Sequence, residues 1–365
     1  MSLNTKKISD WGLGLDKPMI ISGPCSAETE EQVVTTAKEI AALGKVNVLR
    51  AGIWKPRTRP NAFEGIGPVG LEWLNTAKKE TGMLTATEVA TGAHVEECLK
   101  AGIDILWVGA RTTVNPFSVQ EVADALKGVD IPVLVKNPIN PDLGLWIGGL
   151  ERINQAGITR LGAIHRGFST FEKTPFRNLP KWSMAIEMKR KYPDLDIVCD
   201  PSHIAGNRDL IPYVCQKALD LDMSGLMIES HITPSVAWSD AAQQVTPDAL
   251  GELLDSLTFR SASVPSAGNE LDKLRSEIDN LDDDIFQKMA SRMAIAENIG
   301  SYKKDNSVTI LQVGRWEEIV NKRIALGKAM GLGDEFLDAF LKLVHKESIR
   351  RQNIVMNAES ELAGK

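Results

Sequence analysis

The first two thirds of the chain alternate short apolar runs with helical patterns, from Pro18 to about Arg260. Each run is bounded by polar or turn residues, which is typical of repeated βα units around a parallel sheet. Eight strands are predicted in this way, at residues 19–22, 46–49, 83–86, 105–108, 133–135, 160–164, 197–199 and 226–228. Together with seven intervening helical segments they predict a (β/α)8 barrel, with an open doubly wound sheet as the alternative.

The pattern changes after residue 268. Residues 261–268 are small and flexible in composition and predict a linker, and from Asn269 onward apolar residues repeat at spacings of three and four. The first predicted helix runs to about Lys304, and two more cover residues 315–330 and 334–356. A helix of about 35 residues spans about 50 Å, too long for one small domain to cover. We therefore expect an all-helical module that packs against a second copy of the chain.

Composition limits the classes of function. A chain of 365 residues with 43% hydrophobic and 25% charged residues is typical of a globular protein with one large and one small domain. The net charge of −6 argues against nucleic acid as the main partner. No run approaches a membrane span, and the start lacks the apolar core of a signal peptide. The four cysteines show no C-x-x-C spacing, so a reducing cytoplasm is the expected compartment.

The residues that follow the predicted strands carry the candidate chemistry. In a parallel barrel the carboxyl ends of all strands face one mouth, so side chains placed there are expected to converge. Sulfur, nitrogen and oxygen ligands among them form a mixed set that suits Mn, Fe, Co or Zn better than Mg or Ca: Cys25, His203, Glu229 and Asp240. Asp200 and His231 stand in the same stretch as further candidates. A buried histidine beside solvated carboxylates is the alternative interpretation.

A second set of residues near the strand ends is basic: Arg50, Lys55, Arg57, Arg111, Lys136 and Arg166. So many cations on one rim predict anionic ligands that neutralise them. The part from Lys55 to Arg59 can also be read as a solvated charge run. Pro56 and Pro60 stiffen that part, which favours a rigid anion-binding loop.

The helical module carries candidate ligand-binding residues on its first and third predicted helices. Arg292 and Lys303 are eleven residues apart, which returns them to one face about 16 Å apart, within reach of one small ligand. Arg275 lies seventeen residues before Arg292, about 25 Å away, so we expect it to serve the site of a partner subunit. Ser348 and Gln352 form an i, i+4 pair that can face the same ligand. Ordinary solvated helix charges are the alternative.

These residues resemble two known families. Residues 1–260 resemble the β subclass of type I 3-deoxy-D-arabino-heptulosonate 7-phosphate (DAHP) synthases, TIM-barrel enzymes of the shikimate pathway. That likeness rests on Gly23-Pro-Cys25-Ser, Lys55-Pro-Arg57-Thr58, Gly109-Ala-Arg111, Arg166-Gly, Asp200-Pro-Ser-His203 and Asn207-Arg208-Asp209-Leu. Residues 269–365 resemble the all-helical chorismate mutases through Leu274-Arg275 to Ile278-Asp279, Arg292, Gly300 to Lys303, Arg315 and Ser348 to Gln352.

The resemblance implies a role for each candidate residue. In the barrel, Cys25, His203, Glu229 and Asp240 match metal ligands, and the predicted substrate-binding residues are Arg50, Lys55, Arg57, Thr58, Arg111, Lys136 and Arg166. Of these, Arg111, Lys136 and Arg166 match the phosphoenolpyruvate site, and Lys136 is the predicted acid. In the helical module the predicted substrate-binding residues are Arg275, Arg292, Lys303, Arg315, Ser348 and Gln352, with Arg292, Lys303 and Gln352 as the catalytic ones.

The implied functions are two reactions of one biosynthetic pathway. The barrel is expected to condense phosphoenolpyruvate with D-erythrose 4-phosphate, and the helical module to rearrange chorismate to prephenate as a homodimer. Inhibition of the barrel by prephenate is a further expectation. The alternatives are a helical module that is mainly regulatory, and a barrel that is another metal-dependent aldolase. The chain has His165 where many synthases carry glutamate, Arg59 where they carry serine, and Trp316 where many mutases carry glutamate.

Overall fold

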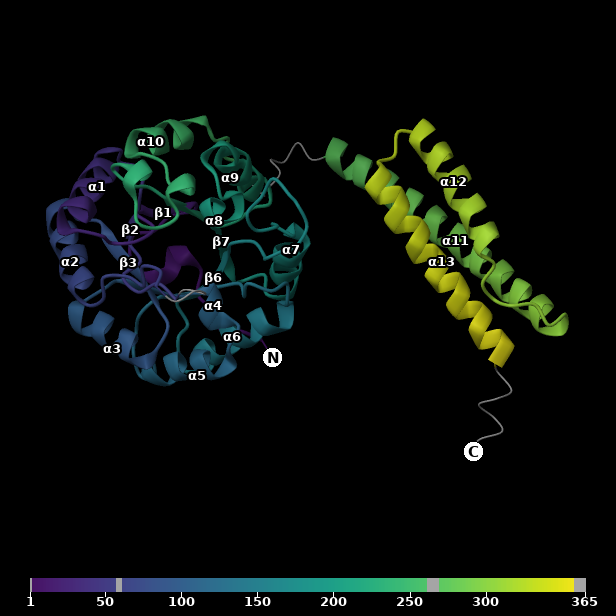
Figure 1. Cartoon of the computed structure of the whole chain (residues 1–365), viewed down its shortest axis with the longest axis horizontal. Helices are drawn as coiled ribbons and strands as arrows, with labels where there is room; N and C mark the ends of the chain where they lie inside the picture. The colour runs from purple at the N-terminus through teal and green to yellow at the C-terminus, as the bar shows by residue number, and fades with distance from the viewer. Residues whose placement is uncertain (1, 57–60, 261–268, 358–365) are drawn as a thin grey trace. The chain divides into compact units, whose positions relative to one another are not determined.

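The computed structural model describes residues 2–56, 61–260 and 269–357 and divides into two compact units, Met1–Ala262 and Ser263–Lys365 (Figure 1). The predicted linker at residues 261–268 lies outside the described residues. Across the described ranges, none of the helices combines the length and the hydropathy needed to span a bilayer.

The first unit is a closed barrel of eight parallel strands in sequential order. β1 and β8 close the ring in a register that runs from Met19 opposite Gly225 to Gly23 opposite Glu229. The strands are β1 Met19–Gly23, β2 Val48–Arg50, β3 Leu84–Val89, β4 Ile105–Val108, β5 Val133–Lys136, β6 Leu161–His165, β7 Asp196–Cys199 and β8 Gly225–Glu229. The predicted (β/α)8 barrel is confirmed, and the alternative of an open sheet is wrong.

Helices surround the barrel because the strands bury both of their faces. Along β1, Met19 and Ile21 belong to the cluster inside the barrel, whereas Ile20 packs in the layer between strands and helices. The outer ring consists of α1 Glu30–Ala42, α2 Val69–Thr81, α3 Gly92–Ala101, α5 Pro116–Ala125, α6 Leu143–Gln155, α7 Trp182–Lys191, α9 Ile211–Asp220 and α10 Pro247–Ser256. Short helices lie in the loops after β4, β7 and β8: α4 Ala110–Thr113, α8 Pro201–Ala205, η2 Arg208–Leu210, η3 Pro234–Val236 and η4 Ala241–Gln243.

An amino-terminal segment fills one end of the barrel. The 3-10 helix η1 (Ile8–Trp11) packs Ile8 and Trp11 into the cluster inside the barrel. Arg160, which directly precedes β6, donates a 2.8 Å hydrogen bond to the Trp11 carbonyl. This contact places the segment at the amino ends of the strands, so the opposite end is left for the mouth.

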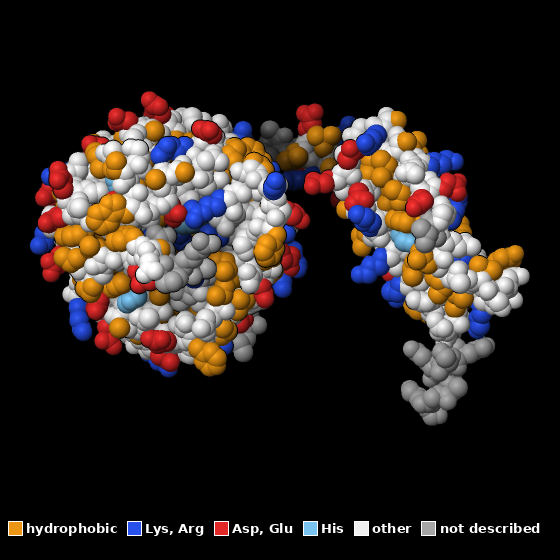
Figure 2. Space-filling model, viewed as in Figure 1, with side chains coloured by type: hydrophobic (Ala, Val, Ile, Leu, Met, Phe, Trp, Pro, Cys, Tyr) orange, Lys and Arg blue, Asp and Glu red, His pale blue; other side chains and the backbone are white. Residues whose placement is uncertain are grey.

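The second unit consists of three helices: α11 Asn269–Asp305, α12 Val313–Ala329 and α13 Asp334–Asn357. They begin and end within two residues of the predicted positions. Gly327 allows close packing, because a Cβ at this position would lie only 2.3 Å from the side chain of Leu337. The first half of α11 carries an exposed apolar row, namely Leu274, Ile278, Leu281 and Ile285. Figure 2 shows how much apolar surface the visible face of this unit exposes.

Candidate active sites

Several predicted residues of the barrel lie at the carboxyl ends of the strands. Arg50 is the last residue of β2, Lys136 of β5 and Glu229 of β8, and all three are buried. Figure 2 shows basic side chains in the hollow at the centre of the barrel face. The mouth therefore gathers charged groups that a barrel interior excludes unless they are paired or bind a ligand.

The one-turn helix α8 presents His203 to this mouth. Asp200 caps the helix by accepting a hydrogen bond from the backbone N–H of His203 at 3.1 Å, and Pro201 occupies the first helical turn. The same carboxylate lies 3.0 Å from Nδ1 of the His203 ring. Asp200 therefore fixes both the turn after β7 and the orientation of the imidazole.

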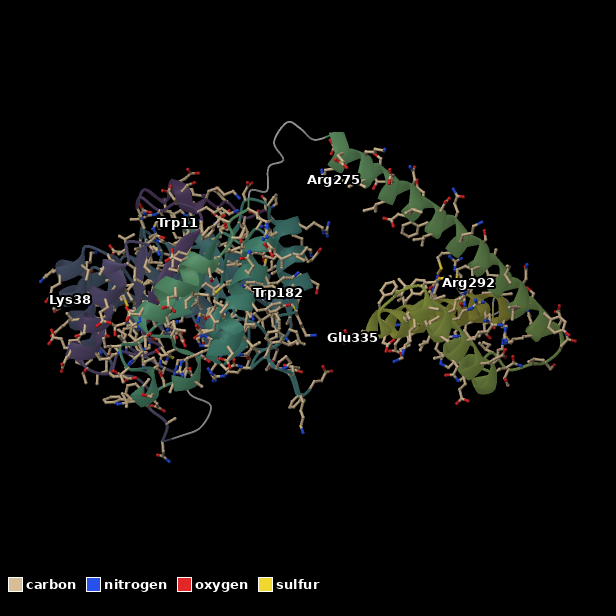
Figure 3. The ribbon with its side chains drawn as sticks, turned by 90° about the horizontal axis from the view of Figure 1, so that it is seen from above. Trp11, Lys38, Trp182, Arg275, Arg292 and Glu335 are labelled. Carbon is tan, nitrogen blue, oxygen red and sulfur yellow. The ribbon has the colours of Figure 1, made fainter. Side chains whose placement is uncertain are left out.

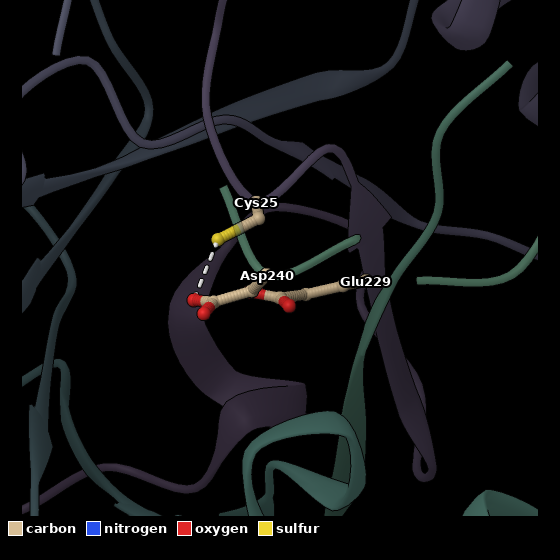
Figure 4. Close-up of side chains that lie close together, drawn as sticks. All are labelled: Cys25, Glu229 and Asp240. Carbon is tan, nitrogen blue, oxygen red and sulfur yellow. Dashed lines mark hydrogen bonds between the residues drawn. The ribbon is translucent and has the colours of Figure 1, made fainter. Parts of the chain in front are cut away.

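Three of the four predicted metal ligands come together in the mouth (Figure 4). The ligand atoms of Cys25, Glu229 and Asp240 all lie within 4.8 Å of one another, and Cys25 Sγ donates to Asp240 Oδ2 at 3.3 Å. His203 is not in this group, but its Nδ1 is 3.7 Å from Glu229 Oε1. Sulfur, nitrogen and carboxylate oxygens are thus close enough to form a possible metal site.

The electrostatics of the cluster fit a bound cation. Burial raises the pKa of Cys25 to about 12, and Glu229 adds to the effect. Burial also favours protonation of Glu229, but His203 and Arg50 outweigh it and leave the pKa of this carboxyl below its usual value. Among the described residues, its buried Oε1 has no hydrogen-bond partner, and it faces Arg50 Nη1 at 3.3 Å. A bound cation would satisfy this oxygen and favour the thiolate of Cys25.

Buried carboxylates already neutralise two of the basic residues. Lys136 Nζ donates to Asp200 Oδ2 at 2.8 Å, and Arg50 pairs with Glu229. Both cations also lie over the ring of Trp107, at 5.7 Å for Lys136 and 4.9 Å for Arg50. These cations are therefore held in fixed positions.

Arg166 is held differently. Its Nη1 donates to the Asn178 side-chain oxygen at 2.8 Å and to the Gly167 carbonyl at 3.3 Å, and both acceptors are neutral. Burial lowers the pKa of Arg166 to about 10, with Asp200 opposing the effect and Arg177 and Arg111 adding to it. A buried guanidinium on neutral acceptors is suited to a bound anion.

The remaining barrel candidates differ in how closely they approach the cluster. Lys55 Nζ donates to Cys25 Sγ at 2.9 Å and to the Cys25 carbonyl at 2.8 Å. Arg111 lies on α4 with an exposed side chain, and Arg57 and Thr58 lie outside the described residues. His231 lies 3.5 Å from Glu28 instead.

Residues that the sequence did not single out also contact the candidate ligands. Arg177 donates to Asp240 at 2.9 Å and to Gln243 at 2.6 Å, and Gln243 donates to Glu229 at 2.7 Å. Arg177 stands in the long loop between β6 and α7, where no apolar period marks its position. Asn178 follows Arg177 directly in the same loop. The local sequence pattern alone cannot distinguish these two polar residues from ordinary turn residues.

In the second unit, four predicted residues lie on facing parts of α11 and α13. Arg292 Nη1 donates to Ser348 Oγ, and Gln352 lies against Gly300 of α11. Lys303 Nζ donates to the Ile310 carbonyl at 2.6 Å, and burial lowers the pKa of Lys303. Within the part of the chain that the structure describes, the buried Oε1 of Gln352 has no hydrogen-bond partner. The two cations and this amide fit an anionic ligand between the helices.

The other two arginines predicted as site residues in this unit lie apart from that group. Arg275 pairs with Asp272 and stands far along α11 from Arg292 (Figure 3). Arg315 is exposed and pairs with Glu318 at 2.6 Å. Trp316, at the position where many mutases carry glutamate, stacks on the His345 ring, with ring centroids 3.9 Å apart. It therefore provides no carboxylate at this position.

Fold and geometry together define the class of protein: a barrel enzyme for anionic substrates with a metal-type centre, joined to a helical anion-binding module. Family models give the same division. Residues 3–260 match the DAHP synthetase I family, and residues 274–353 match chorismate mutase type II.

Individual relatives agree with the family of the barrel. A phospho-2-dehydro-3-deoxyheptonate aldolase of Thermotoga maritima is 34% identical over 238 residues, which cover 65% of this chain and 68% of the relative. A 2-dehydro-3-deoxyphosphooctonate aldolase of Paraburkholderia phymatum is 26% identical, covering 69% of this chain and 93% of the relative. The crystal structure of a Thermotoga maritima DAHP synthase is 33% identical with a TM-score of 0.58, covering 65% of this chain and 66% of that chain.

A truncated form of the DAHP synthase from Thermotoga maritima is 30% identical with a TM-score of 0.56, and the match covers 71% of this chain and 87% of that one.

The chain belongs to the DAHP synthetase I family and carries a chorismate mutase type II module after its barrel. It is a bifunctional enzyme of the shikimate pathway, a transferase joined to an isomerase, and its synthase family is metal-dependent.

Proposed function

We propose that Cys25, His203, Glu229 and Asp240 hold one divalent ion of the Mn, Fe, Co or Zn type, and that the barrel condenses its substrates beside them. The observation that carries this proposal is the group of three ligand atoms within 4.8 Å, one from a buried carboxylate whose Oε1 has no hydrogen-bond partner in residues 2–56, 61–260 and 269–357. When bound, the ion supplies a Lewis acid for the aldehyde carbonyl of erythrose 4-phosphate.

The basic residues hold the two phosphorylated substrates together. Arg111, Lys136 and Arg166 bind phosphoenolpyruvate, and Lys55, Arg57 and Thr58 bind erythrose 4-phosphate. Arg166 supports this assignment best, because its hydrogen bonds end on neutral oxygens and burial favours an anionic partner. Fixing two phosphates and a carboxylate near each other lowers the entropic and electrostatic cost of the reaction.

Lys136 is the proposed proton donor. C3 of phosphoenolpyruvate forms the new carbon–carbon bond to the aldehyde carbon, whose oxygen takes up a proton and becomes a hydroxyl. Water then adds at C2, and phosphate leaves. Lys136 Nζ is buried and hydrogen-bonded to Asp200, so its position is fixed for such a transfer.

An assay of phosphoenolpyruvate loss tests the barrel chemistry. Chelated enzyme should lose activity with erythrose 4-phosphate, and returning Mn²⁺, Co²⁺ or Zn²⁺ should restore it. Cys25→Ala should weaken metal binding in equilibrium dialysis, whereas Cys215→Ala, a matched change of a buried cysteine on α9, should leave it intact. Full activity in metal-free enzyme would exclude the proposed centre.

The similarity to 2-dehydro-3-deoxyphosphooctonate aldolases suggests a competing aldehyde substrate. A 3-deoxyoctulosonate product needs a five-carbon aldehyde in place of the four-carbon one, so the assay is repeated with arabinose 5-phosphate. Faster turnover of the five-carbon substrate would favour the octulosonate reaction of the Paraburkholderia relative.

For the helical module we assign chorismate to Arg292, Lys303, Arg315, Ser348 and Gln352, with Arg275 contributed by a second copy of the chain. The reaction is a unimolecular rearrangement, so positioning and electrostatics suffice for catalysis. Lys303 and Gln352 are placed to stabilise charge on the ether oxygen. The exposed apolar row of α11, Leu274 to Ile285, supports a homodimer because water would otherwise cover it.

We further propose that prephenate bound at this module inhibits the barrel. The binding residues for a product of the mutase are already present, so no additional domain is required. Synthase activity is measured in the full chain as prephenate rises. Activity that stays constant while prephenate binding is detected by calorimetry would exclude this regulation.

A further inference from the structure

Two residues of the loop between β6 and α7, Arg177 and Asn178, contact both α8 and the candidate residues of the mouth. The loop folds back on itself through a two-way backbone pairing of Phe168 with Leu179, at 2.9 and 2.8 Å. The backbone N–H groups of Arg177 and Asn178 then donate to carbonyls of α8 at 3.3 and 3.2 Å. We call these two residues the strap.

Two glycines allow the strap to approach its neighbours. Gly206, at φ +72°, ends α8, and a Cβ there would lie 2.3 Å from the Cβ of Arg177. At Gly167, with φ +77°, a Cβ would lie 2.8 Å from the Asn178 carbonyl oxygen. Both positions combine a backbone conformation suited to glycine with direct contact to the strap. Its placement is therefore fixed by the backbone on both sides.

Asn178 joins the anion side of the mouth to the metal side. Its Oδ1 accepts from Arg166 Nη1 at 2.8 Å, and its Nδ2 donates to the His203 carbonyl at 2.6 Å. The side chain is only 6% exposed. Its amide can face only one way, because the reverse orientation would place a donor against a donor and an oxygen against an oxygen.

Arg177 connects to the carboxylates of two proposed metal ligands, Asp240 and Glu229. It donates to Asp240 directly at 2.9 Å and to Glu229 through Gln243, in steps of 2.6 and 2.7 Å. The strap thus contacts Arg166, a proposed phosphoenolpyruvate residue, and two of the four proposed metal ligands, Asp240 and the backbone of His203, and it reaches Glu229 only through Gln243. Asp200 makes a second connection across the mouth, because it accepts from Lys136 and also from the His203 backbone N–H.

We propose that Arg177 and Asn178 are positioning residues that couple occupation of the anion site at Arg166 to the affinity of the metal site. This inference rests on the proposed function of the barrel. An anion bound to Arg166 changes the strength of the hydrogen bond from the guanidinium to Asn178 Oδ1. Because the amide of Asn178 is planar, this change alters the hydrogen bond from its Nδ2 to the His203 carbonyl. Coupling between two ligands is reciprocal, so the metal must tighten phosphoenolpyruvate by the same factor.

The coupling is measured in the full chain with Mn²⁺ as the probe. Free Mn²⁺ is counted by electron paramagnetic resonance, with and without phosphoenolpyruvate, and the ratio of the two dissociation constants is the coupling factor. We expect about 5-fold or more in the unmodified chain, which is the lower end of ordinary coupling between sites. In Asn178→Ala the factor should fall at least about 3-fold, while each ligand still binds alone.

Two further variants separate positioning from a general loss of structure. Asn75→Ala removes another side-chain amide bond of the barrel, a 2.8 Å contact to the Ala101 carbonyl, and should keep the full coupling factor. Asn178→Asp keeps the acceptor for Arg166 but loses the donor to His203. It should therefore lose the coupling and also weaken phosphoenolpyruvate, because its carboxylate competes for Arg166.

The outcomes distinguish this inference from the proposed function. If neither Mn²⁺ nor phosphoenolpyruvate binds the unmodified chain, the proposed function fails. If both bind without coupling, or if Asn178→Ala keeps the coupling factor, the strap has no such role. Direct electrostatic attraction between Mn²⁺ and phosphoenolpyruvate remains in every variant. Only the part of the coupling factor that is lost in Asn178→Ala therefore supports the proposal. Should Asn178→Ala not fold, Asn178→Asp carries the same comparison.

Discussion

Replacing His165 by leucine tests how strongly burial controls the stability of the barrel. The imidazole stands at the end of β6 between the rings of Trp146, Phe168 and Trp182, with ring centroids 6.2, 5.8 and 5.3 Å away. It has no exposed surface. Leucine keeps an apolar group in this pocket and removes the only atoms there that take up a proton between pH 4 and 7.

The magnitude follows from the pKa of the buried ring. Burial lowers the pKa of His165 from 6.5 to about 4, opposed in part by the Pro180 backbone. Between those values the unfolded chain binds more protons than the folded one, so stability rises with pH and is lost as the pH falls. At pH 5 an unfolded histidine is almost fully protonated and this one is not. The difference amounts to about 2 kcal/mol at pH 5 relative to pH 7.5.

The assay is urea unfolding of chelated protein at pH 7.5 and pH 5, followed by tryptophan fluorescence. Of the eight tryptophans, all except Trp316 belong to the barrel unit, so the signal reports its unfolding. His165→Leu should lose about 2 kcal/mol less than the unmodified chain between the two pH values. The packing cost of leucine cancels, because each protein is compared with itself. His345→Leu, in the helical unit, should not change this difference. Equal losses in all three proteins would refute the reasoning.

Three more predictions concern charge and association. Asp200→Asn retains the helix cap but leaves Lys136 without its buried carboxylate, so the barrel should lose about 3–5 kcal/mol in urea unfolding, and an unchanged stability would contradict the pairing. Asp222→Asn, on an exposed ion pair, should cost under about 1 kcal/mol as a control. Arg292→Ala should abolish chorismate consumption in a spectroscopic assay and leave phosphoenolpyruvate loss measurable; retained mutase activity would contradict the assigned site. Ile278→Asp should shift sedimentation toward monomers, because it places a charge in the exposed apolar row of α11, and an unchanged dimer would exclude that face.

The barrel was predictable because its strands are short apolar runs with polar residues at both ends. The run at residues 105–108 matches β4 residue for residue, and predicted boundaries elsewhere shift by a few residues. Short helices were not predicted, since one turn leaves no period of 3.6 to detect. The N-cap and proline of α8, Asp200 and Pro201, are signals that a search for caps alone would have found.

The candidate site was predictable where it depends on strand ends and not where it depends on loop folding. Glu229 and Lys136 end strands, so the closure of the barrel alone brings them to one mouth. Arg177 and Asn178 reach the same mouth only because the loop folds back through the pairing of Phe168 with Leu179. That pairing joins positions eleven residues apart with no repeating pattern between them, so nothing in the local sequence indicates it.

The two sites treat positive charge in different ways, and this difference explains what each can bind. In the barrel, Arg50 and Lys136 each face a buried carboxylate, whereas the hydrogen bonds of Arg166 end on neutral oxygens. In the helical unit, the hydrogen bonds that hold Arg292 and Lys303 end on a hydroxyl and a carbonyl. Both of those cations therefore retain their charge for a ligand, as a dicarboxylate such as chorismate requires. A metal centre needs anionic ligands, and basic side chains beside those ligands would repel the metal ion unless carboxylates neutralised them. In the barrel, carboxylates neutralise Arg50 and Lys136 in this way.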